Sequence, residues 1–378
     1  MKLLTNVYKD RDGVFVLGGV EDLYTFLDEN LANINMIRGN QYKAVVEKDA
    51  EILRKALITM NTVTEELITL QRSWQYLENI FNSQEIKRAL QAESAIFEQI
   101  DKFFKTQMKN MNQKQLAHKF LTMTRDLPQH LKEKNDAVDK IMKSLSDYLE
   151  TKRNEFPRFN FLSDDELLEI LAKQNDPHAI QGFLKQLFDG LFKLELNETN
   201  DSTAMWSREG EKIEFKKPVK HGNKVEEWLN KIQDEMRHTL TRKLKDGNTA
   251  FTDGKQTKKE WVMDQPAQVV VTVDMIQWCS QTEEHINMMS DDPDALNSWF
   301  TQNEEQLNML TMLVRGDLID LKRSILAALI TQDVHSRAII GELRRDNVQS
   351  IFDFNWQKQL RYYYEEVEGY TETQCVIR

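Results

Sequence analysis

The chain has 378 residues, a length that corresponds to two or three packed units at roughly 150 residues per domain. It contains only 13 Gly and 6 Pro, and 29% of its residues are charged. Sandwiches, barrels and nucleotide-binding α/β folds need frequent turn residues or Gly-rich loops, so this composition argues against them and favours long helices. The net charge of −11 disfavours binding to nucleic acid, to anionic membranes and to the acidic microtubule surface.

The cysteine content and the hydropathy indicate where the protein resides. The two cysteines, Cys279 and Cys375, provide neither a metal-binding spacing nor a disulfide framework, which is typical of a reducing compartment. No apolar run approaches the roughly 18 residues of a membrane helix, and the start at Met1 shows no signal-peptide pattern. We therefore expect a soluble cytoplasmic protein.

The first part of the chain predicts a bundle of long helices. One helix is expected from Glu21, and the next, over about 41–82, carries a heptad seam typical of a coiled coil. Further helices are expected from Ile86 to Met108 and over about 129–155. Long helices with short connections fold back on one another as antiparallel bundles. The seam consists of Leu53, Ala56, Met60, Val63, Leu67, Leu70, Trp74, Leu77 and Phe81.

The helical pattern stops at Pro157, which cannot continue a helix. We expect a structural joint here, in which the side chains of Phe156, Phe159 and Phe161 pack against both neighbouring helical parts. Immediately afterwards, Ser163–Glu166 has the pattern of a capping box, in which a Ser hydroxyl and a Glu carboxylate satisfy the first amides of a helix.

Residues 192–216 switch from helical to alternating periodicity and predict two or three antiparallel strands. An isolated hairpin is marginal in water, so one face must lean on helices. The apolar side chains expected on that face are Phe192, Leu194, Ile213 and Phe215. The basic residues expected to face solvent or the acidic surface of a partner are Arg208, Lys212, Lys216 and Lys217; a merely solvated hairpin face is the alternative interpretation.

Helical periodicity resumes at about Lys224 and continues almost to the aromatic-rich end. The run Val269–Val273 is β-branched, but we predict helix because Pro266 can begin one. The predicted fold is mostly α: an elongated rod of consecutive antiparallel helical bundles with a small antiparallel β-hairpin insertion. Residues 1–155 form its N-terminal bundle and residues 156–378 its C-terminal part.

No catalytic or cofactor-binding pattern occurs in the sequence. It lacks the phosphate-binding loop, the dinucleotide fingerprint, the zinc-protease motif and the nucleophile elbow. Asp333 and His335 are two positions apart on a predicted helix and therefore point in different directions. We expect no catalytic, cofactor-binding or metal-ligating residues and thus no enzymatic activity in this chain.

Ordered motifs along almost the whole chain resemble the linker of dynein heavy chains, the region just upstream of the first AAA+ module. Asn160 and Tyr364 depart from the family pattern, in which an aromatic residue and a Trp are usual. The matching segments are Leu17–Val20, Gln71–Glu78, Ile80–Phe81, Tyr148–Arg153, Phe156–Phe159, Phe161–Ser163, Glu166–Leu171, Ser207–Glu211, Gln265–Val270, Val314–Leu318, Ala328–Thr331, Asp333–His335, Leu360–Tyr363 and Cys375–Arg378.

The resemblance implies a function for a chain that shows no chemistry of its own. The linkers of this family lie across a ring of AAA+ modules and bend and straighten with its nucleotide state, which moves the motor along microtubules. The expected partners are the AAA+ ring of the same heavy chain and, through the parent, other dynein complex subunits. No direct binding to microtubules, membranes or nucleic acid is expected, and ATP and Mg²⁺ belong to the parent motor.

Two further expectations follow from the resemblance. The matched segments are closer to axonemal than to cytoplasmic dyneins, which implies a cilium or flagellum; the outer and inner arms are both left open. The match ends at Arg378, where the first AAA+ module would begin, so the chain resembles a fragment of a motor. A spectrin-like helical scaffold is the alternative, against which the β insertion and the order of the motifs argue.

Overall fold

The structure is a computed structural model that describes residues 4–11, 13–114, 126–366 and 373–377. Its described residues are mostly helical and form three small antiparallel sheets, which confirms the predicted fold class. The chain divides into two units, Met1–Gln174 and Asn175–Arg378, whereas the sequence pattern divides it after residue 155. Met1 and Arg378, where the sequence analysis begins and ends, lie outside the described residues.

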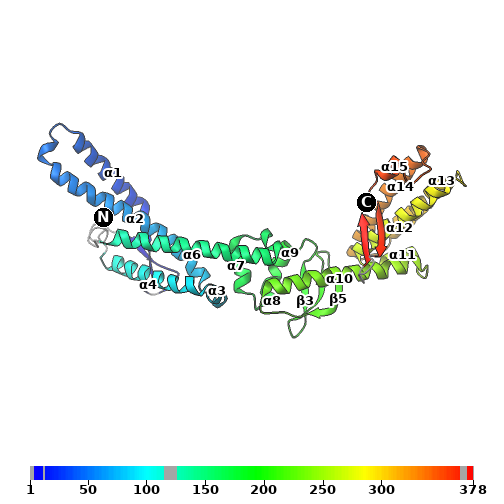
Figure 1. The fold of residues 1–378 in the computed structure, drawn as a ribbon, viewed down its shortest axis with the longest axis horizontal. Coiled ribbons are helices and arrows are strands. Elements are labelled where there is room, and N and C mark those ends of the chain that lie inside the picture. The colour runs from blue at the N-terminus through cyan, green and yellow to red at the C-terminus, as the bar shows by residue number, and fades with distance from the viewer. Residues whose placement is uncertain (1–3, 12, 115–125, 367–372, 378) are drawn as a thin grey trace. The chain divides into compact units, whose positions relative to one another are not determined.

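The first unit contains a β-hairpin and long helices. Its helices α2, α4 and α6 alternate in direction along the chain, as expected for an antiparallel bundle (Figure 1). α2 packs against both α4 and α6. The elements are β1 (Leu4–Val7), β2 (Phe15–Gly18), α1 (Val20–Gly39), the 3₁₀ turn η1 (Lys43–Val45), α2 (Glu47–Ile80), α3 (Gln84–Ala89), α4 (Gln91–Lys114), α6 (Leu127–Glu155), the 3₁₀ turn η2 (Pro157–Phe161) and α7 (Asp164–Ala172).

The heptad seam lies on α2, but both the helix and its buried stripe begin later than predicted. The backbone at Val46 is not helical, and the preceding residues form the 3₁₀ turn η1. Leu53 is 52% exposed, whereas every seam position from Met60 to Phe81 is buried. The start of α2 therefore packs against α1 alone, and its apolar periodicity continues beyond the bundle that buries the rest.

Trp74 is the centre of the first unit's core. Its indole is fully buried and stacks on Phe104 of α4, with ring centroids 4.5 Å apart. The indole Nε1 donates a hydrogen bond of 2.9 Å to Asp101 of the same helix. This bond satisfies the polar edge of the ring, so the aromatic body can be buried at no hydrogen-bonding cost.

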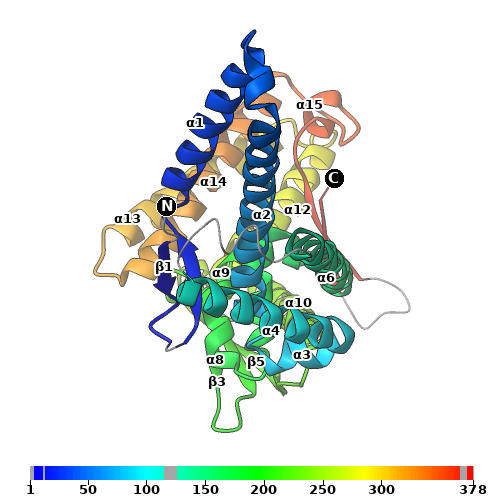
Figure 2. The same ribbon diagram turned by 90° about the vertical axis from the view of Figure 1, so that its left-hand side faces the viewer.

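The hairpin β1–β2 was not predicted. Its strands are antiparallel, with Val7 opposite Phe15, and they lie beside α4 (Figure 2). The side chain of Gln71 on α2 both accepts a hydrogen bond from the backbone N–H of Leu17, at 2.7 Å, and donates one to its carbonyl, at 3.0 Å. Two strands this short depend on such an anchor, because a free hairpin is marginal in water.

The predicted helix from Ile86 to Met108 is broken at its start. Leu90 has φ −120° and ψ 61°, which ends α3, and α4 begins at the next residue. Both Ile86 and Leu90 remain buried. The apolar periodicity thus predicted the buried positions correctly. It gives no sign of the break between α3 and α4, because Ile86 and Leu90 face the core on both sides of it.

The second unit combines short helices, a three-stranded sheet and a group of long helices. The sheet order is β3-β4-β5, with both pairs antiparallel, so the insertion has three strands and ends at Val219 instead of residue 216. The elements are α8 (Pro177–Ile180), the 3₁₀ turn η3 (Gln181–Phe183), α9 (Leu184–Leu187), β3 (Lys193–Leu196), β4 (Ser202–Trp206), β5 (Lys212–Val219), α10 (Val225–Thr252), α11 (Lys258–Asp264), α12 (Ala267–Met288), α13 (Ala295–Val314), α14 (Asp320–Arg345), α15 (Phe354–Gln357), β6 (Tyr362–Glu366) and β7 (Thr373–Ile377).

Helix α12 is the core of this unit and confirms the helix predicted over the β-branched run. It packs against α10, α13 and α14, and Val269, Val270 and Val273 are all buried. Gly247 of α10 allows close approach, since an added Cβ would lie 2.4 Å from a methyl carbon of Val269. Burial on several sides explains how tertiary packing overrides the local strand preference of these valines.

The aromatic-rich end packs on α12. Trp356 is fully buried, and its Nε1 donates to Glu283, which also accepts a 2.6 Å hydrogen bond from the hydroxyl of Tyr363. The adjacent strands β6 and β7 form an antiparallel hairpin that the sequence analysis missed. Hydrogen bonds from Trp356 and Tyr363 therefore hold this aromatic-rich segment on α12, although the side chain of Leu360 is 59% exposed.

Candidate functional site

The three-stranded sheet of the second unit is shaped by its turn and its contact with α10. Gly210 has φ +87°, a conformation that favours glycine, and the N–H of Ser207 bonds the carbonyl of Glu211 across the turn. Leu194 and Phe215 are buried as predicted. Phe192 is 49% exposed and does not lean on the helices as predicted, because the strand begins one residue later and Leu191 is buried instead.

Lys212 is engaged within the sheet. Its Nζ lies 3.0 Å from a carboxylate oxygen of Glu195 on β3 and 3.4 Å from one of Glu214. The hydrogen bond to Glu195 raises the pKa of Lys212, and the same bond lowers the pKa of Glu195. Lys212 therefore links β3 to β5, and the carboxylates of Glu195 and Glu214 neutralise its charge within the three-stranded sheet.

The other three predicted basic residues are exposed but do not lie together. Lys216 lines a groove between β5 and the neighbouring helices, whereas Arg208 and Lys217 do not line it. The backbone N–H of Lys216 donates to Glu235 of α10, at 3.1 Å, which ties this part of β5 to the helix. The predicted basic face is thus divided between an internal pair, a groove wall and the outer surface.

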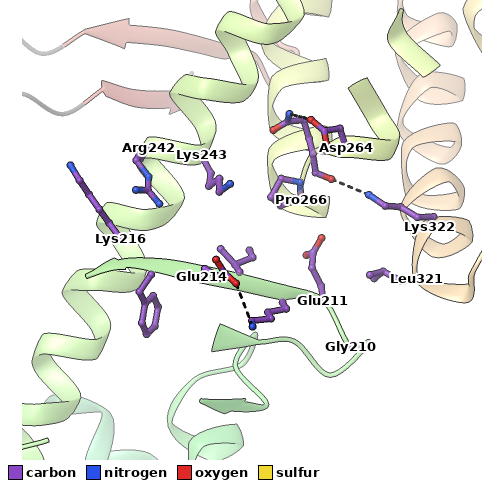
Figure 3. A pocket seen from close by; sticks show the side chains of 14 residues that line it. Gly210, Glu211, Glu214, Lys216, Arg242, Lys243, Asp264, Pro266, Leu321 and Lys322 are labelled. Atoms are coloured by element: carbon purple, nitrogen blue, oxygen red, sulfur yellow. Dashed lines mark hydrogen bonds and ion pairs between the residues drawn. The ribbon is translucent and has the colours of Figure 1, made fainter. Parts of the chain in front are cut away.

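The groove has a volume of about 710 Å³ and is lined by β5 and the turn before it, α10, residues 264–266 between α11 and α12, and the start of α14. Figure 3 shows Arg242 and Lys243 reaching from α10 toward the groove, and Lys322 reaching in from α14 on the opposite side. The sequence analysis missed these three cations. Arg242 and Lys243 are adjacent in the sequence, but only the packing of α10 on β5 reveals that they share a groove with Lys216.

The groove is also lined by Glu211 and Asp264, and hydrogen bonds of Glu211 and Lys322 join its walls. Glu211 accepts a 2.9 Å hydrogen bond from the N–H of Ala267, the first residue of α12. The Nζ of Lys322 donates to the carbonyl of Gln265, at 3.3 Å, and burial lowers its pKa. Glu211, in the turn before β5, therefore caps the start of α12. The sequence analysis did not assign this structural role to the insertion.

The predicted joint lies inside the first unit, between α6 and α7. Phe156 and Phe159 are buried and meet edge to face, with ring centroids 5.0 Å apart. Phe161, in contrast, is 69% exposed and does not make the packing expected of it, whereas α6 ends at Glu155, just before Pro157, as predicted. Helix α7 then begins with the predicted capping box, in which Ser163 and Glu166 exchange both hydrogen bonds.

A second charged cluster, unrelated to the hairpin, lies among the long helices of the second unit. The Nζ of Lys258 on α11 lies 2.6 Å from Asp274 on α12 and 3.8 Å from Asp333 on α14, and it also donates to Gln306 on α13. These charged side chains are largely buried. Two carboxylates thus share one ammonium, and burial followed by the charge of Asp274 raises the pKa of Asp333 to about 8.

Membrane-spanning helices and metal-binding clusters are both absent from the described residues. No helix in the described ranges is both long enough and apolar enough to cross a membrane. Nowhere in the same part of the chain do three or more His, Cys, Asp or Glu side chains gather in a way that could hold a metal ion.

Comparison with known proteins identifies relatives over nearly the whole chain. Residues 1–247 match the family model described as "Dynein heavy chain, N-terminal region 2". The chain is 38% identical over 379 aligned positions to human dynein axonemal heavy chain 6, covering 95% of this chain and 9% of that protein. It is 33% identical to mouse dynein axonemal heavy chain 2, covering 98% and 8%. It is also 33% identical to the dynein-1-beta heavy chain of the flagellar inner arm I1 complex of Chlamydomonas reinhardtii, covering 96% and 8%. The chain thus spans less than a tenth of these relatives.

Proposed function

The chain belongs to the dynein heavy chain family, and we propose that it acts there as the linker, a mechanical lever that converts ATP-driven changes of an AAA+ ring into movement along microtubules. The observation that carries the proposal is the match of residues 1–247 to the N-terminal region 2 model. The relatives named above support it, since each covers at least 95% of the chain. In this proposal ATP and Mg²⁺ bind the parent ring.

The fold supports a lever in a specific way. A lever must transmit force without unfolding, and both units are built from long helices that pack against one another, with α12 also capped by Glu211. We propose that the division at residue 155, where Phe156 and Phe159 pack in the turn after α6, is a structural joint of this lever. The names of the relatives favour an axonemal setting in a cilium or flagellum, within a dynein complex.

The experiment that tests the lever uses a full-length heavy chain that carries this segment, purified without other subunits. Replacing the segment by a flexible Gly/Ser linker should preserve ATP turnover but abolish microtubule gliding. If the segment were a scaffold for partner proteins, the isolated motor would glide at its normal velocity despite the replacement, and the lever proposal would be wrong.

We further propose that the exposed basic residues of the hairpin contact the AAA+ ring. The variant that tests this contact carries Arg208→Glu, Lys216→Glu and Lys217→Glu; it omits Lys212, whose reversal would disrupt the pairing with Glu195. The motor should glide more slowly relative to its ATP turnover. A control with Lys132→Glu, Lys140→Glu and Lys143→Glu, three exposed lysines of α6, makes the same charge change elsewhere. Equal velocities of variant and control would reject the contact.

A further inference from the structure

The groove beside β5 concentrates positive charge that has no internal partner. Lys212 pairs with Glu195 and Glu214, but the side chains of Lys216, Arg242 and Lys243 have no hydrogen bond or ion pair in the described part of the structure. In a chain with a net charge of −11, three unpaired cations on adjoining walls of one groove are unusual. Such a cluster attracts carboxylates, which an Arg can hold through two parallel hydrogen bonds.

The backbone that borders the groove is an exposed sheet edge. The sheet order β3-β4-β5 places β5 at the edge, and residues 210–216, in and just before this strand, line the groove. An edge strand offers unpaired N–H and C=O groups to an additional strand. One of these groups, the N–H of Lys216, is already used by Glu235, so pairing is available along the part of β5 that precedes it.

The charges in the groove are mixed, and this restricts the ligand. Glu211 and Asp264 line the end near α12, whereas Arg242 and Lys243 line the α10 side. A continuous polyanion such as nucleic acid would meet the acidic end unfavourably. A polypeptide segment can instead place its acidic residues beside the cations only. The volume of about 710 Å³ lies within the roughly 300–1,000 Å³ of ligand pockets, which is more than a single phosphate needs.

We propose that this groove binds an extended acidic polypeptide segment, which adds a strand along the edge of β5 and places its carboxylates against Lys216, Arg242 and Lys243. The role of this groove in the motor rests on the proposed function, because it specifies which part of the three-stranded sheet contacts a partner. The binding itself is a property of this chain and can be measured without the motor.

The test measures fluorescence anisotropy of the chain with a labelled peptide of alternating Glu and Thr. An inner variant, Lys216→Glu, Arg242→Glu and Lys243→Glu, should weaken binding by about tenfold or more, since three attractive contacts with carboxylates become repulsive. The matched outer variant, Arg208→Glu, Lys217→Glu and Lys220→Glu, has the same net charge and should bind as the wild type does. Neutral Gln replacements at the inner positions provide a second set, and circular dichroism verifies that each variant is folded.

Further probes separate strand addition and ligand class. A peptide of alternating Glu and Pro keeps the charge but lacks N–H groups at every Pro, so it should bind several-fold more weakly. Equal binding of the two peptides, equal loss in the inner and outer variants, or no binding to the wild type would each overturn the inference. Tighter binding of a labelled oligothymidylate than of the acidic peptide would overturn it as well. If the peptide fails to bind but the hairpin variant still slows gliding in the motor, the ring contact stands and only the groove is rejected.

Discussion

Asp333 should make the folded chain less stable as the pH rises through neutrality. Its burial and the negative charge of Asp274 raise its pKa to about 8, and Lys258 only partly opposes them. In the unfolded chain the same carboxyl titrates near its ordinary value of 3.8. Between these two pKa values the folded chain binds more protons than the unfolded chain, so the free energy of unfolding falls as the pH rises.

The size of the effect follows from the number of protons involved. A difference of one proton changes the free energy of unfolding by about 1.4 kcal/mol per pH unit. Between about pH 5 and about pH 7 the destabilisation should therefore approach 2–3 kcal/mol, and it should level off above the folded pKa. Asp333→Asn removes the titrating group and leaves Lys258 paired with Asp274, so the variant should be the more stable protein at neutral pH.

The assay is urea unfolding followed by circular dichroism at a series of pH values. The control variant is Asp291→Asn, which removes an exposed carboxyl just after α12 and should keep the wild-type pH dependence. The reasoning is refuted if the wild type gains stability between about pH 5 and about pH 7. It is equally refuted if the difference in free energy of unfolding between wild type and Asp333→Asn is independent of pH.

Four other substitutions and one ligand give further tests in the isolated chain. Phe159→Ala should cost about 3–5 kcal/mol in urea unfolding because the ring is fully buried, whereas Phe161→Ala should cost less than about 0.5 kcal/mol. Gly247→Ala should cost about 1–3 kcal/mol, since the new methyl group would overlap Val269. Glu211→Ala should cost about 1 kcal/mol by removing the cap of α12, read as a lower melting temperature. Millimolar ATP should leave the melting temperature unchanged; a rise of several degrees would indicate a nucleotide site.

Local signals predicted local structure well. The capping box at Ser163 and Glu166 forms with both hydrogen bonds, because its two partners are only three residues apart. Pro266 precedes α12 as predicted, and the valines that follow it are helical. The alternation of residues 192–216 correctly predicted antiparallel strands, since the pattern itself records which side chains are buried.

Features that depend on distant partners were missed. The hairpin β1–β2 is held by Gln71, which lies 54 residues after Leu17, and no local pattern records that contact. Phe161 has the same character as Phe159 in the sequence, yet only the latter points into the core. Arg242 was not singled out from the sequence, because only the packing of α10 on β5 places it in the groove. The sequence pattern therefore predicted the strands β3–β5 but not the groove beside them.

Two lysines on one strand show why the placement of charge matters more than its amount. Lys212 and Lys216 both belong to β5 and both contribute to the basic stretch from which a contact was predicted. The first is bound to Glu195, so a partner would have to break that pair before using its charge. The second lines the groove beside Arg242 and Lys243, where an incoming carboxylate would meet charge that has no ion-pair partner in the described residues. A partner that reads this surface should thus depend strongly on Lys216 and weakly on Lys212, although the sequence pattern treats them alike.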